Sequence, residues 1–102
     1  MEWYNYLSAF WAGMFLANSV PHFVQGICGN KFPTVFSKPR GQGLSSPTTN
    51  IYWALINLLI GFVLFKVARI SINNNLVCFI FFAGVATISL YASKRFSTKY
   101  TE

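Results

Sequence analysis

The chain has 102 residues, of which 54% are hydrophobic and only 10% are charged, whereas soluble proteins average about 25% charged residues. Its two carboxylate residues are Glu2 and Glu102, which disfavours hydrolytic, glycosidic and metal-carboxylate chemistry because these need an internal acid. The net charge of +6 comes from basic residues that flank apolar runs. Because no nucleic-acid-binding motif accompanies them, orientation in a membrane explains the charge better than nucleic acid does.

The first expected element is a transmembrane helix over residues 3–27, long enough to cross a bilayer. No Lys or Arg precedes it, which disfavours a signal peptide. Pro21 removes a backbone donor, so we expect a kink there and allow for residues 20–29 to leave the helix. The start of the segment is rich in aromatic residues suited to the headgroup boundary, namely Trp3, Tyr4, Tyr6 and Trp11.

One row of this helix consists of small residues that recur every four positions: Ala9, Gly13 and Ala17. Such a row lets another helix approach closely. The partner is either another span of this chain or a different protein. Gly61 in the second span and Gly84 in the third are the matching candidates for close helix packing.

A polar stripe follows at Asn18, His22 and Gln25, and polar side chains at this depth seldom face lipid. His22 is the only residue whose ordinary pKa lies near neutrality. A single His with distant cysteines and no nearby acid makes a poor metal site, so we expect no metal, no cofactor and no catalytic residue. Two interpretations stay open: His22 ties the helix to the following loop, or the stripe binds a ligand.

Residues 28–49 form a loop rich in Gly and Pro that also carries apolar side chains, so it either lies on the membrane surface or folds back among the helices. Lys38 and Arg40 flank a Pro in this loop and are followed by two glycines. They suit an anion or a lipid phosphate, although an ordinary solvated turn fits as well. The segment lacks the Gly-Lys-Ser/Thr ending of a P-loop.

Ser46 and Pro47 are typical of a helix start, and the second span is expected over residues 50–72. Asn57 lies in mid-span on the same side as Asn50, Trp53 and Gly61. An amide there usually bonds across to a neighbouring helix, so we expect Asn57 to pair with Asn18 or His22, or else to bind a polar ligand.

A polar turn at residues 73–75 precedes a third span over residues 76–93, and the short connection predicts an antiparallel hairpin of the second and third spans. The tail, residues 94–102, carries Lys94 and Arg95, which suit anionic lipid headgroups. Cys28 and Cys78 fall on opposite sides of the membrane in this topology, which excludes a disulfide within the chain.

Residues 21–53 contain the pattern PHFxxGxxGxxFPT followed by GxGxSSPxxNxxW. This block resembles the signature of a family of small, uncharacterised bacterial multi-span membrane proteins. The resemblance implies a bacterial multi-span protein. It also implies that the block from His22 to Trp53 is more important for function than the remaining apolar residues. No activity is implied by it.

We therefore expect a single all-α integral membrane domain with three transmembrane helices. The resemblance implies a bacterial protein, which we expect in the inner membrane. The bias of basic residues predicts the N-terminus outside and the long loop and C-terminus in the cytoplasm. The leading hypothesis is a structural or interaction subunit, working with copies of itself or with other membrane proteins. The alternative is a small oligomeric pore or transporter lined by Asn18, His22, Gln25 and Asn57. A membrane enzyme that acts on lipid is a weaker third hypothesis, because only His22 is available as a general base.

Overall fold

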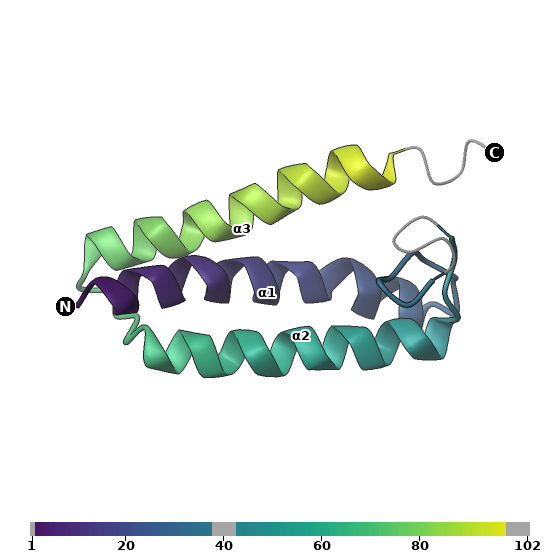
Figure 1. Cartoon of the computed structure of the whole chain (residues 1–102), viewed down its shortest axis with the longest axis horizontal. Coiled ribbons are helices and arrows are strands. Elements are labelled where there is room, and N and C mark those ends of the chain that lie inside the picture. The colour runs from purple at the N-terminus through teal and green to yellow at the C-terminus, as the bar shows by residue number, and fades with distance from the viewer. Residues whose placement is uncertain (1, 38–42, 98–102) are drawn as a thin grey trace.

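The computed structural model describes residues 2–37 and 43–97. These residues form three helices, α1 (Trp3–Ile27), α2 (Pro47–Val67) and α3 (Asn75–Phe96). The all-helical prediction is confirmed, since the one β feature in the described ranges is an isolated bridge between Phe32 and Ser45. Figure 1 shows α1 in the middle, with α2 on one side and α3 on the other.

Helices α2 and α3 run antiparallel but do not pack as a pair. In the described part of the chain the backbones of α2 and α3 do not approach each other, and α1 packs against both (Figure 1). One side-chain contact joins α2 to α3, since the rings of Phe65 and Phe81 lie 5.7 Å apart in an edge-on arrangement. The expected hairpin is therefore not confirmed. The connection between α2 and α3 passes the N-terminal end of α1, where Ala68 is fully buried in a cluster with Ala9 and Val77. This burial holds α1 between the two helices.

Helix α1 has the expected bounds and stays helical through Pro21 as far as Ile27. The expectation that residues 20–29 could leave the helix was therefore wrong for residues 20–27. Gly26 lies so close to α2 that an added Cβ would meet the Ile51 side chain at 2.7 Å and the Pro47 carbonyl oxygen at 2.9 Å. This close packing holds the last turns of α1 against the start of α2. Gly29, just past the helix, has a φ of +74°, which a glycine adopts readily.

Helix α2 begins as the sequence predicts, because the Ser46 Oγ accepts a hydrogen bond of 3.1 Å from the Thr49 N–H and Pro47 is the first helical residue. It ends at Val67 rather than near residue 72. The Nδ2 of Asn5 donates to the Val67 carbonyl at 2.8 Å and so satisfies a helix end. Arg69 then takes a left-handed φ of 54° and turns the chain.

The closest helix approach joins α1 to α3. A Cβ added to Gly13 would collide with the Phe81 carbonyl oxygen, and one added to Gly84 would collide with the Phe10 carbonyl oxygen. The two backbones therefore touch at this crossing. Gly61 of α2 makes the corresponding approach to α1, where it packs on the Leu16 side chain. The small residues thus serve contacts within the chain.

Helices α2 and α3 are both long and apolar enough to cross a membrane. Only 22% of the apolar window of α2 and 11% of that of α3 is buried within the protein, which is unlike the core helix of a soluble domain. Helix α1, the third expected span, does not reach the same apolarity. Its central position explains this, because its polar side chains, among them Asn5, Ser19 and His22, are buried against the neighbouring elements.

Candidate functional site

The most densely bonded polar cluster lies where α1 ends and α2 begins. The Nδ1 of His22 is 2.8 Å from the Oδ1 of Asn50. The Nδ2 of Asn50 donates to the carbonyl oxygens of Phe32 at 2.9 Å, Ser46 at 3.0 Å and Ser45 at 3.3 Å. His22 is 2% exposed and Asn50 is fully buried. One amide therefore connects α1, the start of α2 and both arms of the loop.

Aromatic rings enclose the His22 imidazole. Its centroid lies 5.3 Å from the Phe32 ring, 6.5 Å from the Trp53 ring and 6.5 Å from the Phe96 ring, each in an edge-on arrangement. Phe32 and Phe96 also contact each other at 4.8 Å. The last turn of α3 is thereby packed against the loop and the end of α1. Edge-to-face contacts of this kind add to the apolar burial.

The described part of the loop folds over this end of the bundle. Phe32 and Ser45 exchange two backbone hydrogen bonds, of 3.2 and 3.0 Å, and the hydroxyls of Thr34 and Ser45 lie 2.6 Å apart. Phe32 and Thr34 are buried, whereas Phe36 is 58% exposed. Both arms of the loop thus fold back onto the helix ends, while the apolar side chains of Val35, Phe36 and Leu44 stay exposed.

A second polar pair lies deeper between α1 and α2. The Nδ2 of Asn18 donates to the Oδ1 of Asn57 at 3.1 Å, and the Nδ2 of Asn57 donates to the Trp53 carbonyl at 2.8 Å. Asn57 is 1% exposed. The predicted cross-helix partner of Asn57 is thus confirmed as Asn18, while His22 pairs with Asn50 instead.

The remaining candidate residues lie elsewhere. Gln25 is half-buried on α1, and its side chain makes no hydrogen bond to the described residues. Lys38 and Arg40 fall outside the described ranges. Lys94 and Arg95 lie in the last turn of α3, at the same end of the bundle as the loop. The stripe predicted from the sequence is therefore split into two separate hydrogen-bonded pairs.

The packing candidates all lie at helix contacts or beside them. Ala9, Gly13, Gly61 and Gly84 are buried, and Ala17 is half-buried. Two contributors were not among the candidate site residues, namely Asn5 and Asn50. Asn50 lies seven positions before Asn57 on the same side of α2, and this spacing could have indicated that Asn50 is a buried polar contact as well. Asn5 carried none, because its acceptor Val67 is 62 positions away in the sequence.

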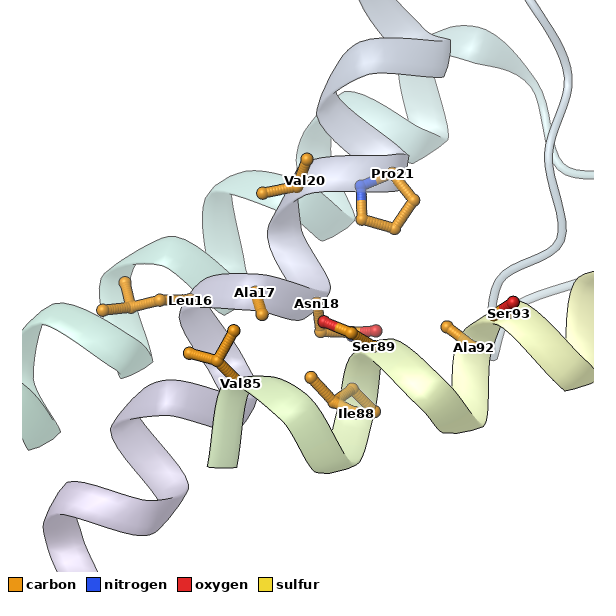
Figure 2. A pocket seen from close by; sticks show the side chains of 10 residues that line it. All are labelled: Leu16, Ala17, Asn18, Val20, Pro21, Val85, Ile88, Ser89, Ala92 and Ser93. Carbon is orange, nitrogen blue, oxygen red and sulfur yellow. The ribbon is translucent and has the colours of Figure 1, made fainter. Parts of the chain in front are cut away.

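Between α1 and α3 lies an apolar groove of about 540 Å³. Figure 2 shows that α1 contributes Ala17 and Pro21 and that α3 contributes Ser89, Ala92 and Ser93, with further lining residues labelled there. It begins beyond the Gly13–Gly84 crossing, where α3 diverges from α1 (Figure 1).

The chemistry of these sites is hydrogen bonding by neutral groups. In the described ranges no three His, Cys, Asp or Glu side chains come together in a way that would hold a metal ion. The carboxylate of Glu2 precedes the start of α1, whereas His22 is near its end, about 30 Å away along the helix. No described carboxylate is thus positioned to exchange a proton with His22.

No family model matches this chain, and no curated protein and no solved structure matches it either.

Proposed function

We propose that this chain is a three-span integral protein of the bacterial inner membrane that acts as a structural or interaction subunit, with copies of itself or with other membrane proteins. One observation carries the proposal: the outer faces of α2 and α3 are apolar and exposed, whereas the polar side chains of α1 are bonded inside. This arrangement suits a lipid environment, in which polar groups need internal partners.

Most of the surface of α2 is apolar and exposed. Its buried residues form one narrow row facing α1: Asn50, Ala54, Asn57 and Gly61. The large apolar side chains around this row are exposed, including Leu59 at 65% and Phe62 at 55%. On α3, Phe79 and Phe82 are exposed at 67% and 64%. Soluble monomers rarely expose a continuous apolar surface of this extent.

The helix lengths fit a bilayer. Helices of 21 and 22 residues measure about 32 and 33 Å, against about 30 Å of hydrocarbon. Helix α1, with 25 residues, crosses beside them as the central span. Its polar side chains are acceptable there because α2, α3 and the loop cover them.

The ends of the bundle favour one orientation. The loop and the C-terminus of α3 lie together at one end, and the connection from α2 to α3 lies at the other (Figure 1). By sequence, six of the eight basic residues belong to the loop and the tail, and Lys66 and Arg69 belong to the opposite end. The positive-inside rule then places the loop and C-terminus in the cytoplasm and the N-terminus outside.

The geometry favours the subunit over the pore. A pore would need Asn18, His22 and Asn57 to face water, yet His22 and Asn57 are almost completely buried and both are bonded to neighbouring amides. The exposed faces that remain for association are apolar and aromatic, which suits helix packing in lipid.

The test has two steps. Membranes containing the chain are first washed with alkaline carbonate, and the protein is expected to stay in the pellet. The chain is then purified in a mild detergent after crosslinking in the native membrane. A stoichiometric membrane-protein partner or a defined homo-oligomer is the expected result. Release by carbonate, or a strictly monomeric chain without partners, would contradict the proposal, and ion flux through reconstituted chains would favour the pore instead.

A further inference from the structure

The groove between α1 and α3 is bounded at both ends. At one end, Gly13 and Gly84 bring the two backbones into contact. At the other end the Phe96 ring reaches back to the rings of His22 and Phe32. Between these contacts the helices stay apart and leave the space of about 540 Å³. This volume lies within the range of about 300–1,000 Å³ that is typical of small-molecule sites.

Small side chains on both helices keep the groove open. Ala17 on α1 and Ser89 and Ala92 on α3 line it, where Leu or Phe would close it (Figure 2). Most of the lining is apolar, and the hydroxyls of Ser89 and Ser93 are its polar groups on α3. A space of this shape and polarity suits a flexible hydrocarbon chain. A further helix of about 10 Å diameter does not fit, because it would have to run past the closed ends.

The end of the groove near Ser93 is basic. Lys94 follows Ser93 in the last turn of α3 and is exposed. Lys31, also exposed, precedes Phe32, whose ring contacts Phe96 in the last turn of α3. The described carboxylate, Glu2, precedes α1 at the opposite end. A cation beside a helix end at the membrane surface attracts the phosphate of an anionic lipid.

We propose that this groove binds one acyl chain of an anionic phospholipid, whose phosphate lies at the basic end of the groove, beside the Ser93 hydroxyl and attracted by the ammonium groups of Lys94 and Lys31. The inference rests on the proposed membrane insertion and assigns a ligand to one defined place in the bundle. The lipid fills a space that the helices leave open and neutralises charge at the basic end.

The full chain is purified in a mild detergent and incubated with equal amounts of phosphatidylglycerol and phosphatidylcholine that have identical acyl chains. Native mass spectrometry then counts the lipids retained on each chain. We expect one phosphatidylglycerol per chain, preferred about fivefold over phosphatidylcholine. Ser89→Leu fills the groove and should lower retention about tenfold. Lys94→Gln should lower the headgroup preference, which Lys31 maintains in part, while leaving acyl-chain binding unchanged.

Thr87→Leu is the matched control, because Thr87 is an exposed hydroxyl residue on α3 that does not line the groove. It should retain lipid like the natural chain. Ala92→Leu is a second filling variant, and circular dichroism checks that each variant is helical. Should both filling variants fail to fold, the headgroup preference of the natural chain and its reduction in Lys94→Gln decide the matter, since Lys94 is exposed.

Equal lipid retention by Ser89→Leu and Thr87→Leu would overturn the inference. So would equal retention of the two headgroups by the natural chain, or a lipid-free dimer, which would place a second copy in the groove. Failure of the inference is distinct from failure of the proposed function. A chain that stays in carbonate-washed membranes but retains no lipid contradicts only the lipid site, whereas a chain released by carbonate contradicts membrane insertion itself.

Discussion

The Nδ1 of His22 and the Oδ1 of Asn50 lie 2.8 Å apart, and the direction of their hydrogen bond follows from the other bonds of the amide. Because the Nδ2 of Asn50 donates to the carbonyls of Phe32 and Ser46, its Oδ1 is the acceptor toward His22. The neutral imidazole must therefore carry its proton on Nδ1. This relationship makes His22 a structural donor that connects α1 to α2 and the loop.

Removing the Asn50 amide should therefore destabilise the chain strongly. In Asn50→Ala the buried Nδ1 of His22 loses its acceptor, and an unsatisfied buried polar group costs about 1–3 kcal/mol. The hydrogen bonds of the amide to the carbonyls of Phe32, Ser45 and Ser46 are lost as well, although the Phe32 carbonyl keeps its bond from the Ser45 N–H. We expect the free energy of unfolding to fall by about 3 kcal/mol, measured by SDS titration in mixed micelles with circular dichroism as the signal.

Asn73→Ala is the control for this variant. Asn73 is an exposed residue of the turn between α2 and α3, and losing its side chain should change the unfolding free energy by less than about 0.5 kcal/mol. Equal stability of the two variants would show that the Asn50 bonds contribute little.

The backbone contact of α1 with α3 predicts a large effect of a single methyl group. In Gly84→Ala the new Cβ meets the Phe10 carbonyl and the Met14 backbone nitrogen, neither of which can rotate away. Overpacking of a buried contact costs about 1–3 kcal/mol of stability, whereas replacing Gly by Ala inside a helix gains about 1 kcal/mol. We expect the cost to be the larger of the two because both contacts are with backbone atoms. We expect a net loss of stability in the same SDS titration.

Gly61→Ala provides the comparison. Its added Cβ meets chiefly the Leu16 side chain, which can change rotamer, so the loss should be smaller than for Gly84→Ala. A larger loss at Gly61 would mean that the α1–α2 contact, rather than the α1–α3 crossing, is the more rigid interface.

The Asn18–Asn57 bond predicts a measurable coupling. The variants Asn18→Ala and Asn57→Ala and the double variant form a cycle. Its interaction energy should be about 0.6 kcal/mol, and at most about 1.7 kcal/mol, the values typical of hydrogen bonds between membrane helices. The single Asn57 variant should be the more destabilised, because Asn57 also donates to the Trp53 carbonyl. Additive single effects would contradict the direct bond.

The proposed orientation predicts the side from which each end is labelled. In a background with Cys28→Ser and Cys78→Ser, a membrane-impermeant maleimide added to intact cells should label Asn73→Cys and miss Lys31→Cys. Both sites are exposed and lie at opposite ends of the bundle. Permeabilised cells supply the control, since both sites should then react. Labelling of Lys31→Cys alone in intact cells would reverse the orientation.

Local chemistry in the sequence was sufficient to predict the helices and to limit the partner of Asn57 to Asn18 or His22. Ser46 and Pro47 mark the start of α2 because a hydroxyl cap and a proline at the first position act on neighbouring backbone groups. The small residues Gly13, Gly61 and Gly84 indicated close packing because a missing Cβ is itself the geometric requirement. Asn18 and Asn57 could be paired because buried amides on adjacent helices need partners.

The tertiary structure alone decided which helices meet. The short connection predicted that α2 would pack on α3, but burial of Ala68 with Ala9 and Val77 draws the connection across α1 and leaves α1 in the centre. The long-range bond from Asn5 to Val67 ends α2 early, and Asn50 rather than Asn57 receives His22. Helix formation depends on residues within a few positions of one another, so the helices could be predicted from the sequence. The order of the helices and the partners of their polar groups depend on contacts between distant residues, which only the packed chain specifies.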